Sequence, residues 1–216
     1  MRVFLVGGEA YFSEKTRRVL NSEPDYEVID GVVACEETIA AIEKSLPDVV
    51  ILDIDCGNYS GLEIARRVKQ SRPSVAVVLV AADYGVEQLL AALKSGANAC
   101  LSKDASSEAL LDVIRKAVQG EYPITQAILH PAVASRIIAE FALVSSPREG
   151  VRYLPARLLP LEAEILWHIS NGSLLDKIVI DMHIAEDTVK QRLYTILGKL
   201  VANHRNSELT DIRRTG

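Results

Sequence analysis

The first 118 residues alternate short apolar runs with stretches of helical periodicity, and this alternation constrains the fold more than any other feature. Four of the five apolar runs are too continuous for strands with one face in water, which is typical of parallel strands buried on both faces. Helical stretches separate the runs, so we predict an α/β fold with an open, doubly wound, five-stranded parallel sheet. The five runs are Val3–Val6, Val28–Ala34, Val49–Leu52, Val75–Ala82 and Ala97–Leu101.

No strand pattern follows Gln119, and the rest of the chain predicts helices. Residues 125–141 have helical periodicity, and Ser145–Gly150 has the composition of a linker. Three more helices are expected, at residues 161–169, 174–182 and 185–200. Two helices joined by a short turn, the second of them cationic, are typical of a helix-turn-helix. We therefore expect an α/β domain at residues 1–118, a helical linker at 119–154 and an all-α domain at 155–216.

Charge is unevenly distributed along the chain, whose net charge is −5. Residues 1–118 contain 13 Lys and Arg against 18 Asp and Glu, whereas residues 151–216 contain nine against eight. Only the last part is therefore suited to nucleic acid, provided that its cations share one face. No apolar run reaches about 18 residues, so we expect no membrane span. The cysteines, Cys35, Cys56 and Cys100, suit neither a disulfide framework nor a zinc site, and a cytoplasmic location is the default expectation.

Two of the predicted strands end in residues of opposite charge. The third strand ends at Asp53, and Lys103 follows the fifth. Because parallel strands in such sheets present their carboxyl ends at one ligand-binding edge, we expect Asp53 and Lys103 to lie together. With Gly61 eight residues after Asp53, this arrangement resembles the receiver domain of a bacterial response regulator. The resemblance implies that Asp53 accepts a phosphoryl group from a histidine kinase and that Lys103 contacts the phosphate.

Several positions depart from the receiver pattern. The family has an acidic pair after the first strand, a Ser or Thr at the end of the fourth and an aromatic residue in the fifth. This chain instead has Gly7, Gly8, Ala81 and Cys100. Mg²⁺ requires several hard oxygen ligands, and only Glu9 and Asp53 remain as weak candidates. We therefore expect a degenerate receiver without a cofactor, without catalytic activity and independent of phosphorylation, in which Asp53 and Lys103 form a residual ion pair.

The C-terminal third resembles a LuxR-type helix-turn-helix, and the two resemblances together cover residues 2–212. The matching segments are Leu159–Leu166, Asn171–Gly172, Lys177–Ile178, Thr188–Lys190 and Ile196–Leu200. The whole chain thus resembles the NarL/FixJ class of response regulators, which implies binding to double-stranded DNA. In one departure, His183 stands where the turn usually has glycine, so a left-handed backbone there would be strained.

The resemblance and the helical spacing assign roles to individual residues of the third C-terminal helix. Thr188 at its start is expected to bind phosphate, helped by the amino end of the helix. Lys190, Gln191 and Tyr194 project outward at a spacing suited to reading bases, with Arg192 at the edge. Lys199 and Arg205 are expected to contact backbone phosphates.

Three hypotheses of function follow. The first is a DNA-binding transcription regulator that acts as a homodimer and needs no phosphorylation. The second is a conventional two-component regulator that a histidine kinase phosphorylates on Asp53. The third, of another class, is a module that sequesters a protein partner and does not bind DNA; the weak positive balance of residues 151–216 keeps it open.

Overall fold

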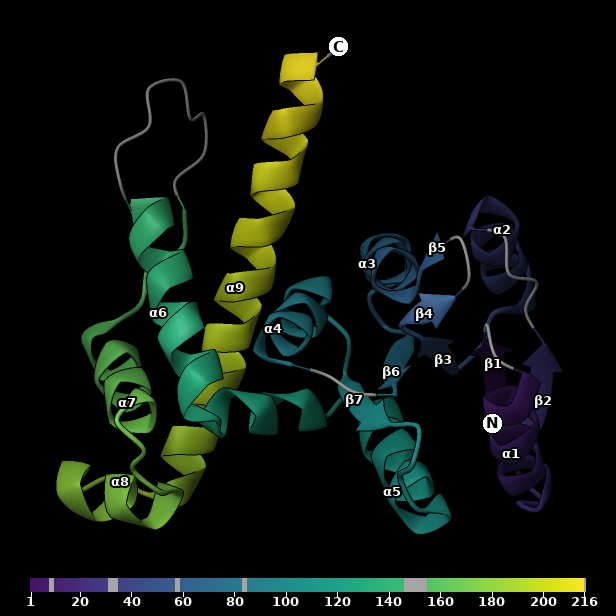
Figure 1. Cartoon of the computed structure of the whole chain (residues 1–216), viewed down its shortest axis with the longest axis horizontal. Coiled ribbons are helices and arrows are strands. Elements are labelled where there is room, and N and C mark those ends of the chain that lie inside the picture. The colour runs from purple at the N-terminus through teal and green to yellow at the C-terminus, as the bar shows by residue number, and fades with distance from the viewer. Residues whose placement is uncertain (8–9, 31–34, 57–58, 83–84, 146–154, 216) are drawn as a thin grey trace. The chain divides into compact units, whose positions relative to one another are not determined.

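A computed structural model describes residues 1–7, 10–30, 35–56, 59–82, 85–145 and 155–215 (Figure 1). It contains two compact units. The first comprises residues 1–85 and 95–124, and the second comprises residues 86–94 and 125–216. None of the described helices is both long enough and apolar enough to cross a bilayer.

The first unit is built on a five-stranded parallel sheet with strand order β2-β1-β3-β6-β7, which confirms the predicted fold class. Asp53, the last residue of β3, lies opposite Val80, and Ala81 lies opposite Ser102. The carboxyl ends of these strands therefore meet at one edge. The strands are β1 (Arg2–Val6), β2 (Glu27–Asp30), β3 (Val49–Asp53), β6 (Ala76–Ala81) and β7 (Ala99–Ser102).

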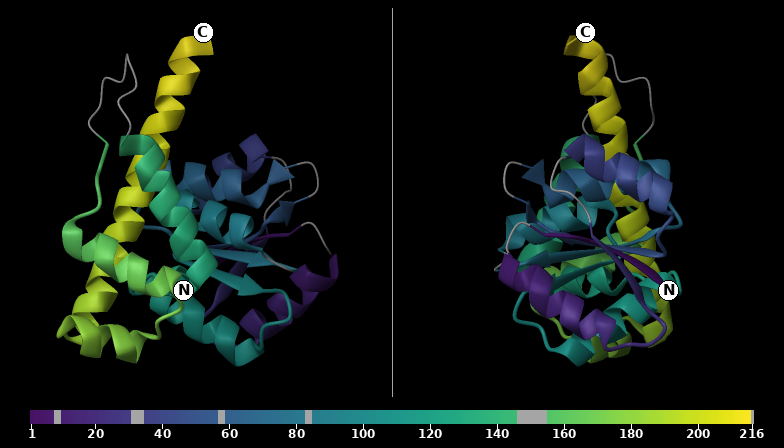
Figure 2. Two further views of the ribbon diagram at one scale, coloured as in Figure 1. Left: turned by 60° about the vertical axis from the view of Figure 1, so that its left-hand side comes forward. Right: turned by 90° about the vertical axis from the view of Figure 1, so that its right-hand side faces the viewer.

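Helices cover both faces of this sheet, which explains why its central strands are apolar without interruption. Helices α1 and α5 contact each other on one face, and α2 and α3 contact each other on the opposite face (Figure 2). Every residue of β3 and β6 is buried. The helices that follow strands of the first unit are α1 (Ala10–Asn21), α2 (Cys35–Ser45), α3 (Gly61–Ser71), α4 (Val86–Ser95) and α5 (Ser107–Val118).

Two local features differ from the expected pattern. Strand β2 begins one residue earlier than predicted and ends at Asp30; the rest of the predicted strand lies in residues 31–34, outside the described residues. A small antiparallel pair, β4 (Asp55–Cys56) with β5 (Tyr59–Ser60), follows Asp53 and was not predicted. Elements of two residues are too short to show a period of two in the sequence.

Pro131 marks a helix start within the predicted helical stretch of residues 125–141, where a proline is expected either to begin a helix or to kink it. The 3₁₀ segment η1 (Pro123–Leu129) is followed by α6 (Pro131–Ser145), with Pro131 as the first residue of α6. Proline suits this position because the first residues of a helix donate no intrahelical hydrogen bond. The predicted linker segment after Ser145 falls in residues 146–154, outside the described residues.

The C-terminal helices are α7 (Pro160–Ser170), α8 (Leu175–Met182) and α9 (Glu186–Thr215). All three pack on one another through a shared core of aliphatic side chains that are at least 96% buried. Helix α9 corrects the sequence prediction, because it continues 15 residues beyond the expected end at Leu200. Residues 201–215 contain no glycine or proline, so nothing in the local sequence terminates the helix there.

Candidate functional site

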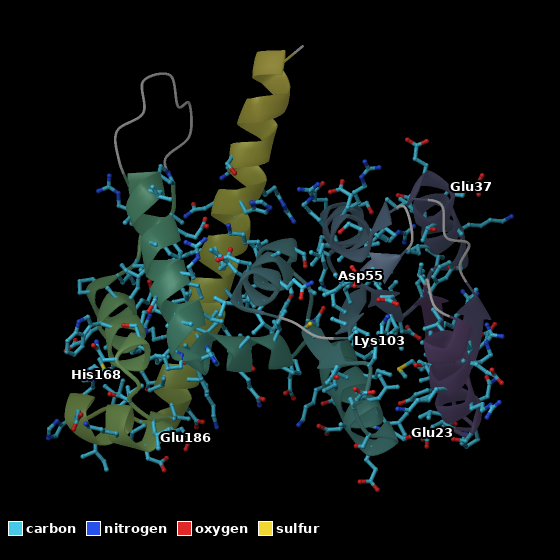
Figure 3. All side chains as sticks on the ribbon, viewed as in Figure 1. Glu23, Glu37, Asp55, Lys103, His168 and Glu186 are labelled. Carbon is cyan, nitrogen blue, oxygen red and sulfur yellow. The ribbon has the colours of Figure 1, made fainter. Side chains whose placement is uncertain are left out.

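The carboxyl-end edge of the sheet brings Asp53 and Lys103 together. Lys103 Nζ lies 2.8 Å from Asp53 Oδ2. The Asp53 side chain is fully buried, and the Lys103 side chain is only 11% exposed. Asp53 Oδ1 accepts a hydrogen bond from the backbone N–H of Asp55 at 3.1 Å. Figure 3 shows Asp55 and Lys103 in this part of the first unit. The charge of the buried carboxylate is thus balanced by a lysine in the loop that follows β7.

Backbone contacts hold this pair in place. The N–H of Lys103 donates to the carbonyl of Ala81, and the N–H of Ile54 donates to the carbonyl of Val80, each at 2.8 Å. Gly61, the first residue of α3, donates its N–H to the carbonyl of Ile54 at 2.9 Å. A Cβ atom at Gly61 would lie 2.0 Å from the carbonyl oxygen of Asp53, so only glycine fits there.

The described neighbours of Asp53 do not supply a carboxylate set for Mg²⁺. Gly7 follows β1, and Ala81 is buried at the end of β6 without a hydroxyl group. Within the described ranges, no three His, Cys, Asp or Glu side chains gather in a group that could hold a metal ion. Gly8 and Glu9 lie outside the described residues, so a metal-binding role for Glu9 stays a prediction.

Lys15 is a residue at this edge that the sequence analysis missed. Its Nζ atom lies 3.5 Å from the carbonyl oxygens of both Lys103 and Ala105. Helix α1 therefore reaches the loop after β7 that carries Lys103. The residues share no motif and stand 88 positions apart, so only the packing of α1 beside α5 brings them together.

Cys100 occupies the strand position at which the family has an aromatic residue. Burial raises the pKa of its thiol to about 11. Very little of the thiol is therefore ionised at neutral pH, and the thiolate is the reactive form. A redox role at this position is accordingly disfavoured.

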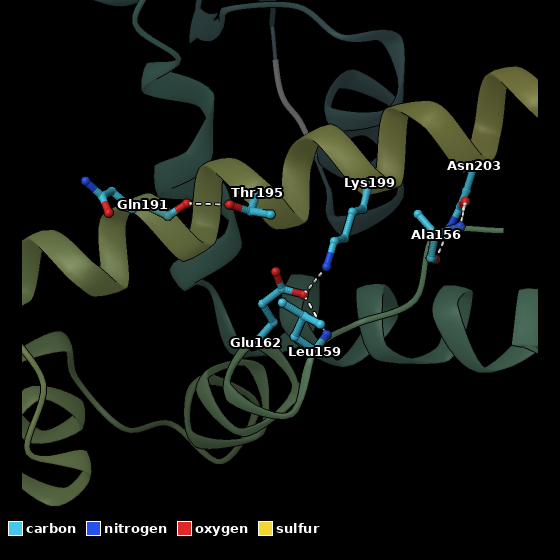
Figure 4. Close-up of polar contacts among 7 residues, drawn as sticks. All are labelled: Ala156, Leu159, Glu162, Gln191, Thr195, Lys199 and Asn203. Atoms are coloured by element: carbon cyan, nitrogen blue, oxygen red, sulfur yellow. Dashed lines mark hydrogen bonds and ion pairs between the residues drawn. The ribbon is translucent and has the colours of Figure 1, made fainter.

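The second candidate site is the solvent-facing side of α9. Lys190 and Tyr194 are 54% and 41% exposed, and Gln191 is also exposed. Thr188 and Arg192 are half-buried at the margins of this face. Thr195 completes it and was not singled out from the sequence; its hydroxyl donates to the carbonyl of Gln191 at 3.0 Å (Figure 4). These side chains form a polar face on the second helix of the helix-turn-helix, which is the helix that such motifs place in the major groove.

Lys199 is placed differently from what its predicted role requires. Its ammonium lies 2.6 Å from Glu162 Oε2, and the side chain is only 19% exposed (Figure 4). The same carboxylate oxygen accepts the N–H of Leu159 at 2.7 Å. Leu159 has no side-chain oxygen with which to cap α7, so Glu162 alone caps this helix start. Lys199 therefore braces α7 against α9, and we leave it out of the DNA-facing set. Arg205 is half-buried.

The turn between α8 and α9 contains the backbone that the sequence analysis flagged. His183 has φ 53° and ψ 42°, a left-handed conformation. A residue with a side chain is disfavoured there relative to glycine. The turn between α8 and α9 therefore carries some backbone strain at His183.

Comparisons with known proteins identify the family of the chain. The response regulator receiver domain family matches residues 3–115. The transcriptional regulatory protein DegU of Brevibacillus brevis is 26% identical over 100% of this chain and 94% of DegU. The nitrate/nitrite response regulator NarL of Escherichia coli K12 is also 26% identical, over 92% of this chain and 88% of NarL.

A solved structure extends the likeness to both domains. The RcsB response regulator of Salmonella typhimurium has a TM-score of 0.51 and 18% identity, with 93% of this chain and 91% of that chain covered. At this identity the likeness concerns the fold alone. The family match spans more than half of the sequence, and the relatives span both of its domains. The chain belongs to the response regulator receiver domain family and, within it, to the NarL/FixJ class of response regulators.

Proposed function

We propose that this chain is a cytoplasmic transcription regulator that binds double-stranded DNA as a homodimer and whose receiver works without phosphorylation. The observation that carries the second half of this proposal is a buried Asp53 beside Gly7 and Ala81, which offer neither a carboxylate for a metal nor a hydroxyl for a phosphoryl group. The exposed polar face of α9 and the full-length transcriptional relatives support the first half. Recognition by a single short helix usually requires two subunits on two half-sites, which is the reason to propose a dimer.

Phosphoryl transfer to an aspartate places negative charge on the transferred oxygens, and a divalent cation is needed to balance it. Gly7 provides no carboxylate, and the Lys103 ammonium already neutralises Asp53. Ala81 provides no hydroxyl for a phosphoryl oxygen. The fully buried Asp53 is therefore a poor nucleophile. The receiver acts instead as a dimerisation or partner-binding domain.

Acetyl phosphate with Mg²⁺ tests the phosphorylation-independent half. We expect no mass increase on the intact protein and no change in light scattering after addition of beryllofluoride with Mg²⁺. A stoichiometric phosphate adduct that disappears in Asp53→Ala would establish the conventional two-component regulator instead.

A gain-of-function variant sharpens this test. Gly7→Asp combined with Gly8→Asp restores an acidic pair after β1, and we expect it to bind Mg²⁺ and to acquire at least partial phosphorylation on Asp53. A control should add charge without straining the backbone. Gly120 and Gly172 are unsuitable for this because both have positive φ, which disfavours a residue with a side chain. Gly198→Asp, at an exposed position of α9, adds a charge outside the unit that contains Asp53 and serves as the control.

The DNA-binding half is tested by a gel shift with genomic fragments. We expect Lys190→Ala with Arg192→Ala to weaken binding at least tenfold and to reduce its salt dependence, because two cations on α9 are lost. Lys44→Ala with Lys116→Ala removes two exposed lysines of the receiver and is expected to bind like the original chain. Unchanged affinity in the α9 variant would refute the assignment.

One observation favours the protein-sequestering alternative. Residues 174–198, which contain α8 and the first three turns of α9, carry four acidic residues against three basic ones. A surface with this balance gains little from the phosphate backbone. Absence of any shifted DNA species at low salt would select this alternative over the DNA-binding regulator.

A further inference from the structure

The lysine best placed to meet DNA is already paired within its own helix. Lys190 Nζ lies 2.6 Å from Glu186 Oε1, one turn earlier on α9. Both side chains are about half exposed, so the pair forms on the surface that would face DNA. Hydrogen bonding and charge attraction from Glu186 raise the pKa of Lys190, and Asp187 and Tyr194 add to the effect. The Lys190 ammonium is therefore charged, and Glu186 already engages it.

The start of α9 provides a second anion in the same place. Glu186 and Asp187 are the first two residues of the helix. Ala185 precedes them and has no side-chain oxygen for capping, while its carbonyl accepts the N–H groups of Thr188 and Val189. Carboxylates in a first turn stabilise a helix because its amino end carries partial positive charge. That same charge attracts phosphate, so the two carboxylates and a DNA backbone compete for one region.

From these contacts we propose that Glu186 acts as an internal phosphate mimic, occupying Lys190 and thereby lowering the affinity of α9 for DNA. Binding then requires exchange of the Glu186 carboxylate for a backbone phosphate. The proposal rests on the proposed DNA-binding function and identifies Glu186 as a residue that sets its strength and salt dependence. It also explains why a helix with a DNA-reading pattern lies in a segment, residues 174–198, whose acidic and basic residues nearly balance.

The consequence for specificity follows from the same exchange. Where a lysine gains little from phosphate, the non-specific part of the binding free energy is small. Discrimination between sequences then depends more on side chains that reach base edges, of which Gln191 and Tyr194 are exposed beside Lys190. Glu186 thus favours selective over tight binding.

The test uses the full chain and a fluorescent duplex of about 30 base pairs of random sequence, long enough for two half-sites. Glu186→Gln keeps the length of the side chain and removes its charge. We expect affinity at low salt to increase about fivefold and the slope of log affinity against log salt to steepen by about one, because one further phosphate contact forms. Glu164→Gln, at an exposed position of α7, is the matched control and is expected to change neither.

A second background separates two routes by which the carboxylate could act. If Glu186 works through Lys190, the gain from Glu186→Gln disappears in the Lys190→Ala background. A gain of equal size in that background would overturn the proposal, because the carboxylate would then repel phosphate directly. Unchanged or weaker binding by Glu186→Gln alone, in a chain that does bind DNA, would overturn it as well.

Thermal unfolding distinguishes this role from a purely structural one. Loss of a first-turn carboxylate affects helix stability, and a stability effect alone predicts weaker binding by Glu186→Gln, with an unchanged salt slope. If neither the original chain nor Glu186→Gln binds the duplex at low salt, the proposed DNA-binding function fails and this inference fails with it. Binding by the original chain without a gain in the variant fails the inference alone.

Discussion

Two buried lysine–carboxylate pairs, one in each domain, have nearly the same geometry and different settings. Asp53 and Lys103 approach to 2.8 Å, and Glu162 and Lys199 to 2.6 Å. Both carboxylates are fully buried, and both lysines are mostly so. Asp53 lies where the strands of a parallel sheet end, the position at which such folds bind ligands. Glu162 lies at the start of a helix.

The difference shows that an ion pair has to be interpreted from what else its carboxylate does. Glu162 also accepts the N–H of Leu159 and so completes the start of α7. Asp53 accepts the N–H of Asp55, two residues along the chain, with Oδ1. Burying an ion pair often stabilises a fold no more than apolar residues would. The pair in the helical domain is therefore a structural brace, whereas the pair in the receiver holds Asp53 at the edge where the strands of the sheet end.

The largest expected effect comes from Glu162→Ala. This change leaves the Lys199 ammonium partly buried without its carboxylate and removes the cap of α7, so we expect the free energy of unfolding to fall by about 4 kcal/mol. Chemical denaturation of the full chain, followed by the fluorescence of Trp167, measures it. Glu164→Ala, on the exposed side of the same helix, should change stability by no more than about 0.5 kcal/mol. Equal losses in both variants would contradict the brace.

Lys103→Met should be rescued by a second change, because the two buried charges compensate each other. Alone, it leaves the Asp53 carboxylate buried and uncompensated, at a cost of about 3 kcal/mol. Addition of Asp53→Asn removes that charge and keeps an acceptor for the N–H of Asp55, so most of the stability should return. Urea titration of the two single variants and the double variant gives the coupling free energy. A double variant as unstable as Lys103→Met would mean that Asp53 stabilises the fold by itself.

Gly61→Ala is expected to cost about 2 to 3 kcal/mol, because its Cβ would meet the carbonyl oxygen of Asp53 and that backbone has to move. Gly198→Ala is the opposite case. Gly198 lies in an exposed part of α9 with nothing within 4 Å of an added Cβ, and alanine there should add about 1 kcal/mol. Melting temperatures of the two variants should thus move in opposite directions. A rise in both would show that the close approach at Asp53 is not required.

The sheet could be predicted from the sequence because its signals are local. Uninterrupted apolar runs such as Val49–Leu52 report burial on both faces whatever the rest of the chain does. Helix ends and two-residue strands are less visible. Helix α9 continues to Thr215 because no residue stops it, and the pair β4–β5 depends on the loop after Asp53 rather than on any periodicity.

The site residues also fall into those that the sequence predicts and those that only tertiary packing reveals. Asp53 and Lys103 could be paired in advance because parallel strands deliver their carboxyl ends to one edge. Lys199 looked like a DNA-facing cation because its partner, Glu162, is 37 residues away and meets it only after α7 packs on α9. Lys15 was missed for the same reason. Charge in a sequence identifies cations, but tertiary packing decides which of them are already engaged.

Lys69 extends the comparison to a buried lysine whose ammonium is held by neutral groups. Its Nζ donates to the carbonyl oxygens of Pro73 and Val75 at 3.1 and 2.8 Å. It also lies 5.6 Å from the centre of the Tyr122 ring. The side chain is nearly inaccessible to water, and burial lowers its pKa to about 8. Carbonyl dipoles and a ring face thus compensate this charge less fully than a carboxylate would.

The smallest expected effect is therefore a dependence of stability on pH. The unfolded chain holds the Lys69 proton up to about pH 10.4, whereas the folded chain releases it near pH 8, so folding becomes more favourable as the pH rises between these values. From pH 7 to pH 9 the gain should be about 1 kcal/mol. Denaturation at a series of pH values measures it, and Lys69→Met should remove this part of the rise, whereas Lys44→Met, at an exposed position, should retain it. A rise of the same size in Lys69→Met would assign the dependence to another group and show that neutral dipoles hold a buried ammonium as well as a carboxylate does.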